Sequence, residues 1–196
     1  MSNRGSVTLF IGPMFSGKTQ RMIMAVERAA YAKKKGLIVR YAGDSRTGTV
    51  QTHDKREVIE CADHRSPIRL ATAERLADVL IDPTEAVVGV DEGQFYGDLV
   101  EVVDSWADRG LQVFVAALDG DDKRRPFGRV IELIPRSEQV EKLNAVCHIC
   151  GHDAAFSKCL VEKSEVTLIG GAEKYISVCR ECFARPIPGT ETLDAR

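Results

Sequence analysis

One eight-residue segment constrains the fold of this chain more than any other feature. Residues 12–19 read GPMFSGKT and fit the pattern G-x-x-x-x-G-K-[ST]. An apolar run rich in β-formers precedes the segment at residues 7–11, and an amphipathic helical pattern follows it from residue 19 to about 32. Such a strand–loop–helix unit belongs to an α/β fold and predicts a loop that binds phosphate groups.

The residue types in this loop suit that chemistry. Glycines let the backbone bend and approach phosphate oxygens closely, while loop N–H groups and the helix N-terminus point at negative charge. Lys18 is placed to reach the β- and γ-phosphates, and the Thr19 hydroxyl is placed to ligate Mg²⁺. The sequence therefore predicts a site for ATP and Mg²⁺ made by Gly12, Pro13, Met14, Phe15, Ser16, Gly17, Lys18 and Thr19.

The rest of residues 1–144 alternates between strand-like and helix-like patterns. Apolar runs at residues 37–41, 86–90, 111–116 and 130–134 predict strands, and residues 72–80 and 99–107 predict helices. Strands with so few polar residues suit a sheet covered on both faces. We therefore predict a P-loop (RecA-like) parallel sheet with flanking helices over this part of the chain.

A pair of acidic residues ends the run at 86–90. In P-loop proteins an aspartate at this point lies beside the phosphate loop and holds Mg²⁺, which makes Asp91 the candidate. Glu92 has two possible roles from its position alone. It could position a water molecule, as in an ATPase, or accept a proton from a substrate hydroxyl, as in a kinase.

Two C-x-x-C pairs mark a second, smaller module at residues 145–185. Cys147, Cys150, Cys179 and Cys182 can supply four thiolates to one structural Zn²⁺. His148 and His152 are alternative ligands nearby. Zinc would close residues 151–178 into a loop pinned at its base, which predicts a lid domain, and residues 186–196 are expected to be a disordered tail.

The net charge of −2 offers no basic surface for nucleic acid or an anionic membrane. The apolar run that follows the first residues is too short for a signal peptide, and no apolar stretch is long enough to span a membrane. We therefore expect a cytoplasmic protein with neither kind of partner.

Several motifs together resemble the zinc-containing, type II thymidine kinase family over nearly the whole chain. They are residues 12–19, THD at 52–54, DEGQF at 91–95, ALD at 117–119, PFG at 126–128, both cysteine pairs, and IGGAEKY at 169–175. One departure is the segment 120–125, which lacks the phenylalanine that this family would place around Asp122.

The resemblance implies a reaction and a fuller site. ATP would donate its γ-phosphate to the 5′-hydroxyl of thymidine or deoxyuridine, with Glu92 as general base. The further residues implied at the ATP and Mg²⁺ site are Asp44, Ser45, Arg46, Asp91, Gly93 and Gln94. Those implied at the nucleoside are Met14, Phe95, Leu118, Phe127 and Ser157, with Val166, Thr167, Leu168, Ile169, Gly170 and Tyr175 from the lid. The resemblance also implies a homotetramer that dTTP inhibits.

Two other functions remain open on the sequence. A P-loop ATPase with a zinc ribbon would need a basic track or a partner-binding segment, and neither is visible. A zinc-ribbon interaction module with a regulatory nucleotide site would lose no turnover on mutation of Glu92.

Overall fold

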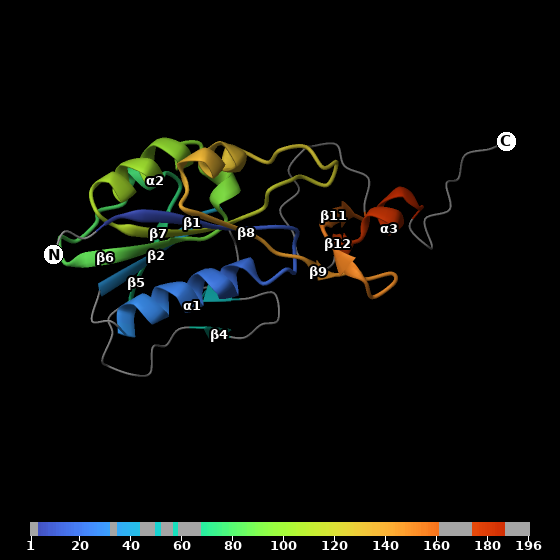
Figure 1. Cartoon of the computed structure of the whole chain (residues 1–196), viewed down its shortest axis with the longest axis horizontal. Helices are drawn as coiled ribbons and strands as arrows, with labels where there is room; N and C mark the ends of the chain where they lie inside the picture. Colours follow the sequence, from blue (N-terminus) through green and yellow to red (C-terminus); the bar gives the residue numbers. More distant parts are fainter. Residues whose placement is uncertain are drawn as a thin grey trace.

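The computed structural model describes residues 4–31, 35–43, 50–51, 57–58, 68–160 and 174–186. Its centre is a six-stranded sheet in the order β5-β2-β6-β7-β1-β8, with every neighbouring pair parallel (Figure 1). The strands are β1 (Ser6–Ile11), β2 (Lys35–Tyr41), β5 (Ile68–Ala73), β6 (Glu85–Val90), β7 (Gln112–Ala117) and β8 (Gln139–Lys142). This arrangement confirms the predicted α/β sheet.

Helices cover the two faces of the sheet, as the apolar strands require. Helix α1 (Lys18–Tyr31) lies on one face, and α2 (Leu99–Asp108) lies on the other with the 3₁₀ helix η3 (Val130–Arg136) (Figure 1). Alternate residues of β1 divide between the two cores: Leu9 packs in the α2 core, and Phe10 packs in the α1 core. In a parallel sheet covered on both faces, functional loops gather where the carboxyl ends of the strands lie side by side.

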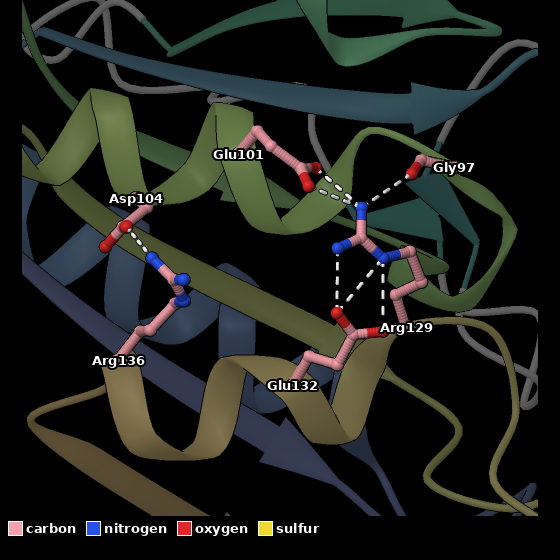
Figure 2. A network of polar contacts seen from close by, with 6 residues as sticks. All are labelled: Gly97, Glu101, Asp104, Arg129, Glu132 and Arg136. Atoms are coloured by element: carbon pink, nitrogen blue, oxygen red, sulfur yellow. Dashed lines mark hydrogen bonds and ion pairs between the residues drawn. The ribbon is translucent and has the colours of Figure 1, made fainter.

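Helices α2 and η3 are joined on their outer side by ion pairs (Figure 2). Arg129 contacts Glu101 at 2.6 Å and Glu132 at 2.7 Å, and Arg136 pairs with Asp104. Arg129 also donates to the Gly97 carbonyl at 3.3 Å. Hydrogen bonds from the guanidinium are the main cause that lowers the pKa of Glu101 and of Glu132.

The helix predicted at residues 72–80 is wrong. This segment contains the end of β5 and the short 3₁₀ helix η1 (Leu76–Asp78). Asp98 accepts hydrogen bonds from the Leu76 and Ala77 N–H groups, and this contact from α2 caps the turn. Leu80, near the end of this segment, is 86% exposed. A tertiary contact and pairing with β2 therefore override the local helical pattern.

The strand predicted at residues 130–134 is also wrong, because these residues form η3. Val130 and Leu133 are buried at a spacing of three, while Ile131 and Ile134 are exposed. That spacing places the buried pair on one side of a 3₁₀ helix. The sheet is instead extended by β8, a short edge strand of polar character that the apolar runs did not predict.

A smaller module follows β8, and we call its described residues, 145–160 and 174–186, the cysteine module. It contains β9 (Ala145–Val146), β10 (Asp153–Ala154), β11 (Phe156–Cys159), β12 (Tyr175–Val178) and α3 (Arg180–Ala184). β9 pairs with β10, and β11 pairs with β12. Its small core includes Cys147 and Cys182. The predicted tail falls mostly outside the described residues.

Three short elements complete the described chain: β3 (Val50–Gln51), β4 (Glu57–Val58) and the 3₁₀ helix η2 (Gly93–Phe95). Among the described helices, none combines the length and the apolar character that crossing a bilayer demands.

Candidate active site

The GPMFSGKT loop lies between the end of β1 at Ile11 and the start of α1 at Lys18. Gly12 has φ of 143°, and a Cβ there would lie 2.3 Å from the Leu143 carbonyl oxygen, so only glycine fits. The Lys18 ammonium donates to the Pro13 carbonyl at 2.7 Å, and the Ser16 hydroxyl donates to the same oxygen at 2.8 Å. The Lys18 ammonium and the Ser16 hydroxyl therefore both contact the backbone of the phosphate loop at the N-terminus of α1.

The carboxyl end of β6 brings Asp91 to the foot of this loop. Asp91 is 5% exposed, and its Oδ1 accepts a hydrogen bond from the Thr19 hydroxyl at 2.8 Å. Strand β7 separates β1 from β6, so the contact joins the helix that follows β1 to the residue that follows a non-adjacent strand. A hydroxyl and a carboxylate side by side are hard oxygen ligands that suit Mg²⁺.

Glu92 follows directly, in a turn that redirects its side chain. Its φ of 55° and ψ of 43° are left-handed, which is strained for a residue with a Cβ. Gln94, 4% exposed, donates from Nε2 to Glu92 Oε2 at 2.5 Å. Its Oε1 accepts the Leu118 N–H at 2.9 Å. A single buried amide thus links the carboxylate to the end of β7.

Aromatic rings gather beside the acidic turn. Phe95 and Phe127 meet edge to face, with ring centroids 5.6 Å apart at 86°. Tyr41 stacks on Phe95 at 5.0 Å. Phe95, Leu118 and Phe127 are all half-buried, so the described part of the chain offers an apolar surface next to Glu92. Such a surface suits a ligand with a flat, weakly polar ring.

The remaining predicted residues are not all in this group. Met14 is joined to Ser157, whose hydroxyl accepts the Met14 N–H at 2.9 Å. Phe15 packs against the core of the cysteine module. Tyr175 is buried on β12 in register with Cys159. Several predicted site residues lie outside the described residues: Asp44, Ser45, Arg46, Val166, Thr167, Leu168, Ile169 and Gly170.

The four predicted cysteine ligands come together. Their sulfur atoms all lie within 4.8 Å of one another, and the Cys150 and Cys179 sulfurs are 3.7 Å apart. Tetrahedral Zn²⁺ with bonds of about 2.3 Å separates its sulfurs by about 3.8 Å, so the donor set fits. Burial would raise the pKa of Cys147, but backbone N–H donors, chiefly that of Cys179, outweigh it and lower the pKa to about 6. A thiolate, the form that binds metal, is thereby favoured at this position.

Comparison with known proteins shows which sequences this chain is similar to. The sequence model of the family described as "Thymidine kinase" matches residues 5–183. The chain is 45% identical to the thymidine kinase of vaccinia virus (strain Western Reserve) over 185 residues, which is 92% of this chain and 98% of the viral protein. It is 44% identical to the thymidine kinases of variola virus and monkeypox virus, with the same two shares covered.

The chain belongs to the thymidine kinase family. Membership makes it a kinase, and ATP is the phosphate donor that this implies. The family resemblance drawn from the motifs is therefore confirmed.

Three features of the candidate site in this thymidine kinase family member were not visible in the sequence. Ser157 and Met14 are 143 residues apart, and no local pattern predicts their hydrogen bond. Phe15 was placed beside the phosphates, yet its ring lies against the cysteine module. The left-handed backbone at Phe15, with φ of 64°, was equally hidden because this conformation is rare for phenylalanine.

Proposed function

We propose that this chain transfers the γ-phosphate of ATP to the 5′-hydroxyl of thymidine, giving dTMP and ADP, and that it also accepts deoxyuridine. The observation that carries the proposal is the grouping of Thr19, Asp91 and Glu92 at the carboxyl edge of the sheet. It unites a phosphate loop, a pair of oxygen ligands and a candidate base.

The phosphate end of the site has a clear division of roles. Loop N–H groups and Lys18 bind the phosphate oxygens of ATP. Thr19 and Asp91 would hold Mg²⁺, which would neutralise charge on those oxygens. Asp44, Ser45 and Arg46 are proposed nearby from the motif resemblance.

Glu92 is the proposed general base. Its carboxylate takes the proton of the 5′-hydroxyl as the oxygen attacks the γ-phosphorus, and the bond to the β-phosphate oxygen breaks to release ADP. Gln94 holds the carboxylate in place through the 2.5 Å hydrogen bond. Gly93 lies between them at the start of η2, where a Cβ would come within 2.9 Å of the Val115 side chain.

The nucleoside base is proposed to lie on the apolar surface of Phe95, Leu118 and Phe127, with Met14 and Ser157 near its edge. Residues 166–170 and Tyr175 are proposed as the lid. Zinc would act structurally: the four thiolates leave no open coordination position for a substrate. From the motif resemblance we further propose that the protein is a cytoplasmic homotetramer that dTTP inhibits.

The test is to incubate the protein with Mg²⁺-ATP and thymidine and to separate the nucleotides. We expect dTMP from the wild type and a fall of about 10²- to 10⁴-fold in kcat for Glu92→Gln. Glu74→Gln, at an exposed site outside this group, controls for the loss of one negative charge.

The other outcomes separate the alternatives. ADP without dTMP would replace the kinase with an ATPase. Undiminished turnover in Glu92→Gln would remove this residue as the base. Bound zinc and ATP without turnover on any deoxynucleoside would favour a regulatory nucleotide site.

A further inference from the structure

The phosphate loop is held by the cysteine module as well as by the sheet. Three residues of the loop meet the chain that follows β8. The Leu143 carbonyl closes over Gly12, the Ser157 hydroxyl accepts the Met14 N–H at 2.9 Å, and the Phe15 ring packs against the module's core. In Figure 1 the module lies at the end of the sheet where β1 meets α1.

Phe15 is the least expected of these contacts. Its φ of 64° is in the left-handed region. A residue with a Cβ adopts this conformation at a cost in free energy and keeps it only where its surroundings enforce it. Its ring packs against a cluster that includes Ala145, Cys147 and Cys182. Two of these are candidate zinc ligands. Phe15 of the phosphate loop therefore packs against the same small core to which two candidate zinc ligands belong.

Ser157 makes a second connection to the same place. It is 6% exposed on β11 and lies opposite Ser177 of β12. The Ser177 hydroxyl donates to the Val146 carbonyl at 2.7 Å, and the Ser177 backbone carbonyl accepts the His148 N–H at 2.9 Å. Those two residues flank Cys147. The Met14–Ser157 hydrogen bond, the pairing of β11 with β12 and these two hydrogen bonds thus connect the Met14 backbone to the residues on either side of Cys147.

We propose that Phe15 and Ser157 are positioning residues through which the zinc-closed cysteine module holds the phosphate loop in its nucleotide-binding conformation. The proposal rests on the proposed function, because it takes ATP as the ligand of the loop. The proposal goes beyond that function because it couples the zinc site and the ATP site thermodynamically. Coupling is reciprocal, so bound ATP must also retain the zinc.

Two measurements on the zinc-loaded full chain test this, neither of them a rate of turnover. The first is the Kd of ATP without thymidine, so that the predicted role of Ser157 at the nucleoside does not interfere. The second is the rate of zinc transfer to a chelating dye, with and without ATP. For Phe15→Ala and Ser157→Ala we expect Kd to rise about 5-fold or more. We also expect ATP to slow zinc release in the wild type and to slow it much less in the variants.

Matched variants separate positioning from general loosening of the module. Phe183→Ala removes another ring that packs on the same cluster but lies outside the loop, so it should leave the Kd of ATP near the wild-type value. Ser157→Thr keeps the hydroxyl and should restore tight ATP binding. Phe15→Ala keeps a Cβ at the left-handed position, so it tests the ring contact and not the backbone type.

The outcomes are distinguishable from failure of the proposed function. A wild type that does not bind ATP would overturn both proposals. A wild type that binds ATP, with unchanged Kd in Phe15→Ala and Ser157→Ala, would overturn the coupling alone. An equal loss of ATP affinity in Phe183→Ala would also overturn the coupling, because the effect would then reflect the general stability of the cysteine module.

Discussion

Gln94 should support both the stability and the activity of this kinase. The variant Gln94→Met distinguishes the role of Gln94 from that of Glu92. The buried amide serves two groups at once, the Leu118 N–H and the Glu92 carboxylate. Methionine has a similar length but neither accepts the N–H strongly nor donates to the carboxylate. Glu92→Gln, in contrast, removes only the charge of the proposed base.

The magnitude follows from what is left unpaired. An orphaned buried N–H costs about 1–3 kcal/mol of unfolding free energy, and a chain of this size shifts in Tm by about 2–4 °C per kcal/mol. The expected fall in Tm for Gln94→Met is therefore about 2–12 °C. A lost hydrogen bond to a charged group, about 1.5–3 kcal/mol, corresponds to a fall in kcat of about 10- to 150-fold if it acts fully in the transition state.

The assay measures Tm by calorimetry and kcat for dTMP formation on the same preparations. Gln94→Glu is the informative partner, because its carboxylate still accepts the Leu118 N–H. It also replaces the amide donor with a second negative charge beside Glu92, so kcat should fall although the Leu118 N–H stays paired. A Gln94→Met protein with lowered Tm and unchanged kcat would refute the orienting role. Unchanged values of both would refute the network.

Three further predictions concern stability and zinc. Tyr96→Phe should raise the unfolding free energy by about 1 kcal/mol in denaturant titrations, because the buried Tyr96 hydroxyl has no hydrogen-bond partner among the described residues; a loss would mean that the hydroxyl is paired. Cys182→Ser should lower bound zinc and Tm together, whereas Cys159→Ser should keep one zinc per chain by atomic absorption; equal retention in both would remove Cys182 as a ligand. Arg129→Gln should lower Tm at neutral pH and low salt, and the difference should vanish on acidification. The lowered pKa of Glu101, from an ordinary 4.5, means that its stabilising contribution is complete above that value and is lost as pH falls through the folded pKa. A difference that persists at pH 2 would contradict this.

Local patterns predicted the site elements more reliably than the supporting ones. The strand before the phosphate loop, helix α1, the run that ends at Asp91 and helix α2 all lie where the sequence placed them. Each has a strong apolar period or a motif. The errors fall at residues 72–80 and 130–134, whose short apolar spacings fit either a helix or a strand.

The edge strands could not be found in the same way. β8 carries Gln139, Glu141 and Lys142 in four residues, and it is a strand because β1 offers it a partner. β5 likewise pairs with β2, while the following turn is capped by Asp98 from α2. These are non-local contacts, and propensity does not report them.

The sequence by itself determined the chemistry: a phosphate loop, an acidic pair at a strand end, and four cysteines in two pairs. These are recognisable because each function needs particular residue types at a short, fixed spacing. Only the tertiary structure decided how the parts are coupled. It brought Thr19 against Asp91, linked Glu92 to β7 through Gln94, packed Phe15 of the phosphate loop on the cysteine module, and bonded Met14 to Ser157 of that module. The reason is physical: packing and buried hydrogen bonds between distant segments form only once the chain has folded, and spacing along the sequence carries no record of them.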